Sequence, residues 1–141
     1  MTFLEIIEEI HRKDPGVTCG ALVGSDGLTV EEWRGPGDDR DLPALCAEVV
    51  RFFREADRIA AENGLGAEEE VHLGGERAQV FAAENGLGAE EEVHLGGERA
   101  QVFIRKAAAE YFLVIVTDPA TVPGKCRFLL RQAARRVREM L

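Results

Sequence analysis

The residues of this chain that could do chemistry are few, and most of them occur twice. Two of its three histidines, His72 and His94, take the same place in two identical stretches of 22 residues, 60–81 and 82–103. Each copy also carries a run of three consecutive glutamates. Paired histidines could hold a metal ion, and paired carboxylates could act as general acid and base. A metal site would need the two copies side by side, and no pocket is indicated for the glutamates. We therefore interpret the glutamates as a solvated run or as one that guards a strand edge.

Nucleophilic and phosphate-binding chemistry is poorly supported. Ser25 is the only serine and lies in a predicted turn, so a Ser-His-Asp arrangement is not credible. No G-x-x-x-x-G-K-[ST] loop is present, so the chain is not itself expected to be a GTPase. The three cysteines, Cys19, Cys46 and Cys126, are odd in number and form no C-x-x-C pair, which indicates neither a disulfide framework nor a zinc site. We therefore expect three buried thiols in a reducing cytoplasm. We therefore expect no catalytic residue, no metal and no cofactor.

Composition indicates one domain over residues 1–141, with 45% apolar and 30% charged residues. The net charge is −9, and each copy adds five glutamates and one arginine, so the acidity says little about partners. Nucleic-acid binding is disfavoured because it needs a basic surface. No apolar run is long enough to suggest a membrane span, and the acidic start is unlike a secretion signal, so we expect a cytoplasmic protein.

The first part of the chain predicts a helix followed by a hairpin. Thr2 and Glu5 form a capping box, and apolar residues follow at helical spacing until "KDPG" at 13–16. Strands are predicted at 17–24 and 28–33, joined by the turn "SDG", in which Gly27 supplies a positive φ.

The longest predicted helix runs from Leu42 to Asn63. Its apolar stripe is wider than a helix resting on its own sheet needs, which favours a second buried contact, such as a partner's helix. The alternative is a deeply buried helix in a monomer. The stripe comprises Leu42, Leu45, Cys46, Val49, Val50, Phe52, Phe53, Ala56, Ile59 and Ala60.

The chain after the copies predicts a central strand and a closing helix. Residues 111–118 are apolar almost throughout, which indicates a strand with both faces covered. The last helix is expected from Gly124 or Lys125 onward. Its basic outer face could dock on an acidic surface or on nucleic acid, but we favour a solvated face, since no aromatic residues interleave with it. Its expected inward residues are Phe128, Leu129, Ala133, Val137, Met140 and Leu141.

With one copy removed, these elements predict an α+β fold, a five-stranded mostly antiparallel sheet with helices on both faces. Two copies are too few for a solenoid, and their identity suggests a recent, engineered or artefactual duplication. The extra copy could loop out, pair with a second chain, or form a second hairpin. We favour the hairpin, with strands at 68–73, 76–81, 90–95 and 98–104 and the glycine pairs at 74–75 and 96–97 as turns.

Almost the whole chain, apart from one copy, resembles the roadblock/dynein light chain domain family, especially its bacterial MglB type. The matching features are "LVGSDGL" in the first hairpin, an "E-x-V-H-x-G" strand, a "V-F-I" strand, an apolar strand ending in Thr-Asp, and "GK" before a closing amphipathic helix. These motifs describe the order of elements, and none of them is catalytic.

The resemblance implies a homodimer whose two sheets join through the strand after the second helix, with the second helices side by side. In this chain either copy could supply that edge. The candidate edge residues are Glu70, Val71, His72 and Leu73 in the first copy and Glu92, Val93, His94 and Leu95 in the second.

The resemblance also implies a partner, a small Ras-like GTPase of the MglA type. The regulator would raise GTP hydrolysis by reshaping the switch regions of the GTPase, without inserting an arginine of its own. The alternative is a dimeric scaffold for signalling or motor components. Candidate contact residues lie on the outer side of the long helix: Glu48, Arg51, Arg54, Glu55 and Arg58.

Overall fold

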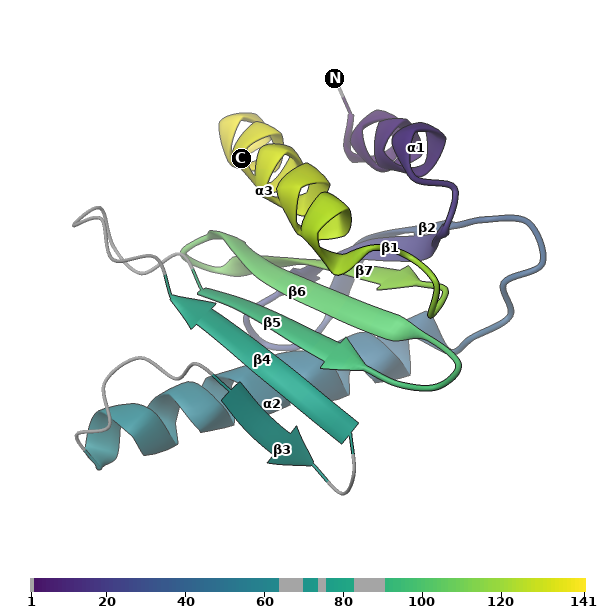
Figure 1. Cartoon of the computed structure of the whole chain (residues 1–141). Coiled ribbons are helices and arrows are strands. Elements are labelled where there is room, and N and C mark those ends of the chain that lie inside the picture. Colours follow the sequence, from purple (N-terminus) through teal and green to yellow (C-terminus); the bar gives the residue numbers. More distant parts are fainter. Residues whose placement is uncertain (1, 64–69, 74–75, 83–90) are drawn as a thin grey trace.

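One antiparallel sheet separates two layers of helix (Figure 1). The computed structural model describes residues 2–63, 70–73, 76–82 and 91–141. Within these residues the elements are α1 (Phe3–Lys13), β1 (Val17–Gly24), β2 (Thr29–Arg34), α2 (Leu42–Glu62), β3 (Glu70–Leu73), β4 (Glu76–Ala82), β5 (Glu91–Gly96), β6 (Gln101–Ala108), β7 (Tyr111–Thr117) and α3 (Pro123–Met140).

Helix α1 begins and ends where its capping residues predict. The Thr2 hydroxyl accepts a hydrogen bond from the Glu5 N–H at 3.2 Å, and the Glu5 carboxylate accepts one from the Thr2 N–H at 3.1 Å. This reciprocal pair satisfies two backbone donors that the first turn of a helix leaves without partners. The N–H of Asp14 closes the other end by donating to the Ile10 carbonyl.

The described strands form a seven-stranded sheet in the order β2-β1-β7-β6-β5-β4-β3, and every neighbouring pair is antiparallel. The first five strands of this order are the five that the sequence predicts. The hairpin β3–β4 extends the sheet beyond β5, so the α+β fold is confirmed together with the hairpin alternative for the extra copy.

Strand β7 lies at the centre of the five-stranded part, between β1 and β6, and both of its faces are covered as predicted. Leu113 and Ile115 point into the core shared with α1 and α3. Phe112, Val114 and Val116 point into the core shared with α2. Because side chains alternate along a strand, an uninterrupted apolar strand fills both cores at once.

The two identical copies pair in different registers. Glu70 of β3 lies opposite Gln79 of β4, whereas its counterpart Glu92 of β5 lies opposite Arg105 of β6. The β5–β6 turn is closed by a hydrogen bond from the Gly97 N–H to the Ala100 carbonyl, so the strand predicted from residue 98 begins only at 101. The predicted turn at 74–75 and the predicted reversal at 83–89 lie outside the described residues.

Helix α2 also has the predicted bounds. The Asp41 side chain accepts a hydrogen bond from the Ala44 N–H, and Pro43 stands in the first turn, where a missing N–H costs little. At the other end, the backbone N–H and side-chain amide of Asn63 both donate to the Ile59 carbonyl.

The chain itself buries most of the described residues in the first half of the apolar stripe on α2. Leu42, Cys46, Val49 and Val50 are buried against the sheet, whereas Ile59 is 43% exposed. The side chains of Phe53, Ala56 and Ala60 lie outside the described part. The predicted second contact on this helix remains a prediction.

Helix α3 packs on the sheet with a different face from the one predicted. Its buried residues are Cys126, Leu129, Leu130, Ala133, Ala134 and Val137. The prediction was wrong for Phe128, Met140 and Leu141, which are 55%, 41% and 55% exposed. At 3.6 residues per turn, Phe128 lies roughly 200° around the helix from Cys126, so both cannot face the sheet.

Candidate functional site

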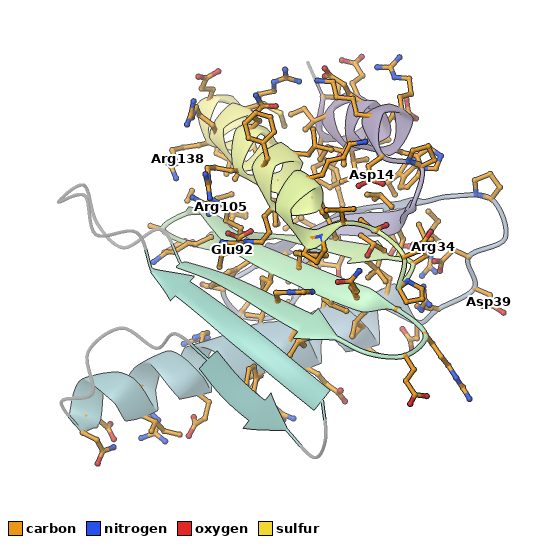
Figure 2. All side chains as sticks on the ribbon, viewed as in Figure 1. Asp14, Arg34, Asp39, Glu92, Arg105 and Arg138 are labelled. Carbon is orange, nitrogen blue, oxygen red and sulfur yellow. The ribbon has the colours of Figure 1, made fainter. Side chains whose placement is uncertain are left out.

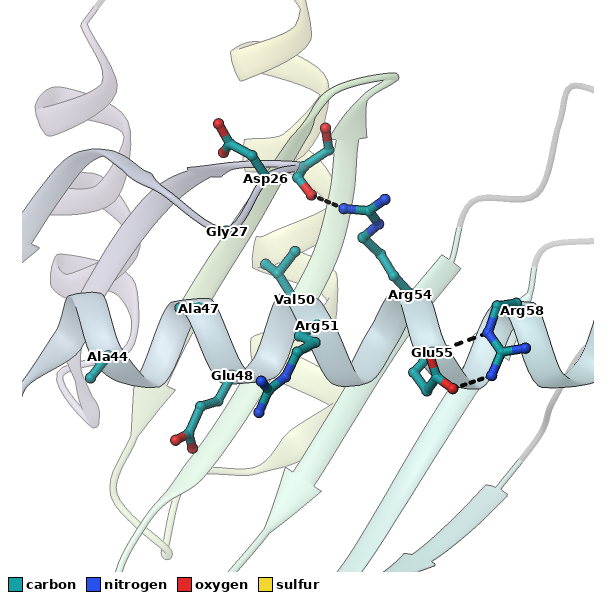
Figure 3. Close-up of a pocket in the computed structure, with 11 residues that line it drawn as sticks. Asp26, Gly27, Ala44, Ala47, Glu48, Val50, Arg51, Arg54, Glu55 and Arg58 are labelled. Atoms are coloured by element: carbon teal, nitrogen blue, oxygen red, sulfur yellow. Dashed lines mark hydrogen bonds and ion pairs between the residues drawn. The ribbon is translucent and has the colours of Figure 1, made fainter.

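A groove of about 840 Å³ runs between α2 and the turn that joins β1 to β2 (Figure 3). The turn contributes Ser25, Asp26 and Gly27. Helix α2 contributes the remaining lining residues, which are Ala44, Ala47, Glu48, Val50, Arg51, Arg54, Glu55 and Arg58. Most of the helix residues recur every three or four positions, so they share one face of the helix.

Gly27 places the turn against the helix. Its φ is +87°, a conformation that L side chains rarely adopt. A Cβ at this position would lie 3.5 Å from the Cα of Ala47, so the turn rests directly on a small residue of α2. Asp26 stiffens the turn by accepting a hydrogen bond from the Leu28 N–H at 3.0 Å.

Several charged side chains of the groove are already engaged. Arg54 donates to the Ser25 carbonyl at 2.5 Å and so joins the helix to the turn. Arg58 pairs with Glu55 and, at 2.7 Å, with Glu62. The hydrogen bond from Arg58 lowers the pKa of Glu55, and the bonds to Glu55 and Glu62 raise the pKa of Arg58.

Glu48 and Arg51 occupy the middle of the groove. Both are exposed, and neither has a hydrogen bond or ion pair with any residue the structure describes. Together with the small residues Ala44 and Ala47, they leave an open surface on which charges of both signs are available. Such a surface suits a protein partner that offers complementary charges.

The structure brings all five predicted contact residues to this groove: Glu48, Arg51, Arg54, Glu55 and Arg58. Sequence reasoning missed the turn residues and the two alanines, because nothing in the chain order shows that the first hairpin folds over the second helix. The geometry leaves partner binding itself as a prediction.

The two candidate edge strands have different positions. Strand β3, with Glu70, Val71, His72 and Leu73, is the last strand of the sheet. Strand β5 is paired on both sides, with β4 and with β6, so placing Glu92, Val93, His94 and Leu95 at an edge of this chain was wrong. The extra hairpin covers the side of β5 that would otherwise be open.

Glu92 is also an exception to the solvated run predicted at 90–92. Its side chain is 1% exposed and lies 3.3 Å from Arg105, beneath α3 (Figure 2). The Nε of Arg127 on α3 lies 3.5 Å from the same carboxylate oxygen, Oε2. Glu92 therefore links β5 to β6 and to α3 through ion pairs made by its buried carboxylate.

His94 contacts two neighbouring side chains, which favours a structural role over a catalytic or metal-binding one. Its Nε2 lies 2.8 Å from the Gln101 side-chain oxygen, and its ring stacks on Phe103 with centroids 4.3 Å apart. Burial lowers the pKa of His94. The side chain of His72 lies outside the described part, within which no group of three or more His, Cys, Asp or Glu residues is placed to hold a metal ion.

The three thiols are buried, as predicted. Burial raises the pKa of Cys19, Cys46 and Cys126 to about 12 in each case. A thiol must lose its proton to act as a nucleophile, so these cysteines are packing residues. Among the described residues, no helix is both long enough and apolar enough to cross a membrane.

The arrangement defines a fold class. A central antiparallel sheet with α2 on one face and with α1 and α3 on the other is the roadblock fold, here with one additional hairpin.

Solved structures share this fold. MglB from Thermus thermophilus superposes with a TM-score of 0.70 at 18% identity, covering 98% of this chain and 87% of that one. MglB from Myxococcus xanthus gives 0.68 at 14% identity, with 98% and 93% covered. A roadblock/LC7 domain from Streptomyces avermitilis gives 0.66 at 14% identity, with 97% and 95% covered. At these identities the likeness concerns the fold.

Sequence comparison adds relatives but no family. Two uncharacterized proteins of Methanocaldococcus jannaschii are each 25% identical over 128 residues, which is 91% of this chain and 90% of each relative. No family model matches the chain.

Proposed function

We propose that this protein is a homodimeric, non-catalytic regulator of a small Ras-like GTPase, of the GTPase-activating type. The observation that carries the proposal is the groove between α2 and the β1–β2 turn, which gathers Glu48, Arg51, Arg54, Glu55 and Arg58 on one accessible surface. The likeness of the fold to MglB supports the same reading.

The chemistry of the groove suits positioning a partner better than attacking a substrate. Arg54 and Arg58 are held by the Ser25 carbonyl and by neighbouring glutamates, so neither is poised to reach into the active site of another protein. Regulation would then act through the shape of the partner's switch regions. A surface of alternating charge can hold one conformation of such a loop in preference to another.

Dimerisation is part of the proposal. Ile59, in the second half of α2, is 43% exposed, and a second copy of α2 lying alongside would bury it. Among the described strands β3 ends the sheet, and an edge strand can pair with a strand of another chain. The dimer edge would therefore lie one hairpin further out than β5.

The test mixes the protein with a Ras-like GTPase from the same genome, loaded with GTP, and follows phosphate release. We expect faster hydrolysis and a complex on a sizing column. No acceleration and no complex would exclude regulation. Light scattering at micromolar concentration should give twice the mass of the chain, and a monomer would contradict the dimer.

A scaffold for signalling or motor components is the second candidate, because the same groove could bind a protein without altering its chemistry. A stable complex with the GTPase and an unchanged rate of hydrolysis would favour this function over regulation.

A further inference from the structure

Helix α3 carries an unusual concentration of positive charge for an acidic protein. It has six cationic side chains and one acidic one, while the whole chain has a net charge of −9. The acidic charge therefore lies elsewhere, and the molecule is electrically polarised between α3 and the rest of the chain.

Three of the six cations are directed into the structure. Arg127 contacts Glu92 of β5, Arg136 pairs with Glu9 of α1, and Arg138 donates to the Ala107 carbonyl of β6 at 2.8 Å. These contacts, together with the buried apolar face, fix the rotation of α3 about its own axis.

The other three cations point outward and flank an aromatic ring. Lys125, Arg131 and Arg135 are exposed, and none has a hydrogen bond or ion pair with a described residue. Phe128 stands among them and is 55% exposed, the one aromatic side chain among the exposed large apolar residues of the described part. At helical spacing the four lie on one face, and we call them the basic stripe.

The rest of the layer formed by α1 and α3 carries too little negative charge to repel an anionic surface strongly. On α1, Glu9 pairs with Lys13 and with Arg136 of α3. The exposed glutamates Glu5 and Glu8 are partly offset by the exposed Arg12, and Leu4 adds an apolar side chain that is 43% exposed. The remaining acid on α3 is Glu139, near its end.

The basic stripe is exposed on α3, which lies on the opposite side of the sheet from α2 (Figure 1). The groove described above lies on the α2 side. A row of exposed cations with one exposed aromatic ring suits a flat anionic surface into which the ring can insert.

The proposed dimer gives a second reason to expect a flat anionic surface as the partner of the stripe. Two sheets that continue edge to edge about a two-fold axis perpendicular to the sheet keep α1 and α3 of both copies on the same side. Both basic stripes would then face one plane, and the two α2 helices would face away from it. A membrane is a partner that reaches both stripes together, which increases binding through avidity.

We propose that the basic stripe of α3 docks the protein on anionic phospholipid membranes, with the α2 groove turned toward the solvent. The paired orientation of the two stripes rests on the proposed dimer, whereas the stripe itself does not. A single stripe would bind weakly and reversibly, and the dimer would bind more tightly.

The test is co-sedimentation with phosphatidylcholine vesicles that contain or lack phosphatidylserine. We expect binding to the phosphatidylserine vesicles only, with release at high salt because the attraction is screened. Since each cation near such a surface contributes roughly fivefold to partitioning, Arg131→Glu/Arg135→Glu should weaken binding by about 25-fold or more. Phe128→Ser should weaken it without changing its salt dependence.

Arg51→Glu/Arg99→Glu is the matched control, because it makes the same change of net charge outside the stripe. Arg51 lies on α2, and Arg99 is exposed in the turn between β5 and β6. This control variant should keep vesicle binding and lose stimulation of the GTPase through Arg51. Arg131→Glu/Arg135→Glu should do the reverse, so failure of one proposal is distinguishable from failure of the other.

Equal binding to neutral vesicles, or no binding to anionic ones, would overturn the membrane proposal. Capture by immobilised polyglutamate without any binding to vesicles would also overturn it, and would assign the stripe to an acidic protein. Circular dichroism of each variant shows that loss of binding does not come from unfolding.

Discussion

The carboxylate of Glu92 lies 3.3 Å from the guanidinium of Arg105, where the two side chains are only 1% and 4% exposed. The identical residue of the first copy, Glu70, lies opposite Gln79. Arg105 follows the second copy and has no counterpart in the first, because Ala83 stands at the equivalent position. A buried charge pair costs much of its Coulomb energy in desolvation, but it favours the one arrangement that pairs both charges. Arg105 thus helps to decide which copy lies beside β6.

Replacing Glu92 should destabilise the protein far more than replacing Glu70. Glu92→Leu leaves Arg105 buried without that carboxylate, and such a loss typically costs about 3–5 kcal/mol of unfolding free energy. Glu70→Leu is the matched control in the same sequence context, and we expect a change within about 1 kcal/mol. Urea unfolding measures both. An equal loss of unfolding free energy in the two variants would mean that either copy can pair with β6.

The same pair can be tested by removing both charges. Glu92→Leu/Arg105→Met should recover much of the stability that Glu92→Leu loses, since the buried guanidinium that faces this carboxylate is removed as well. A double variant as unstable as the single one would show that packing around Glu92, and not charge pairing, sets the cost.

His94 should make stability fall in mild acid. Burial lowers its pKa, so below the ordinary histidine pKa the unfolded chain takes up a proton more readily than the folded chain. The contribution of neutral His94 to the free energy of unfolding is complete above about pH 6.5 and is lost as the pH falls below that value. His94→Gln should flatten the melting temperature between neutral and mildly acidic pH, and His72→Gln is the matched control. An unchanged pH profile in His94→Gln would contradict this role.

The three cysteines should resist thiol reagents in the folded protein. Their pKa of about 12 keeps them protonated at neutral pH, and each of them is buried. Ellman's reagent should therefore react at the rate of unfolding, and promptly with three thiols in denaturant. Fast labelling of any one thiol in the native protein would show that this cysteine is not buried.

Deleting residues 60–81 should leave a folded protein. Ile59 would then be followed by the second copy, whose first letters repeat the lost end of α2. The deletion removes β3 and most of β4 and exposes β5, a strand that keeps its pairing with β6. We expect unfolding free energy at least equal to that of the full chain, with stronger self-association in sedimentation. A large loss of stability would show that the hairpin has become structural.

Local chemistry made much of the fold predictable. The capping box at Thr2, the turn at Gly27 and the stop at Asn63 are short-range signals, and each fixed a boundary that the structure confirms. The apolar strand 111–117 was predictable because its residue types suit no other place in a sheet. The five groove residues followed from helical spacing once the outer face of α2 was identified.

What depends on tertiary context was not predictable. Identical letters cannot tell which copy pairs with β6, and that choice involves Arg105, which lies outside both copies. The inward face of α3 was misassigned because its small buried residues, such as Ala134, give a weaker signal than Phe128. The groove's turn residues required the packing of Gly27 on Ala47.

The central claim is that the α2 groove regulates a GTPase, and single-turnover GTP hydrolysis tests it most directly. A Ras-like GTPase from the same genome is loaded with GTP and mixed with wild type, Arg51→Glu or the control Arg99→Glu. We expect wild type and Arg99→Glu to accelerate hydrolysis, and Arg51→Glu to stimulate it at least about tenfold less. Equal stimulation by all three, or no stimulation by wild type, would contradict it.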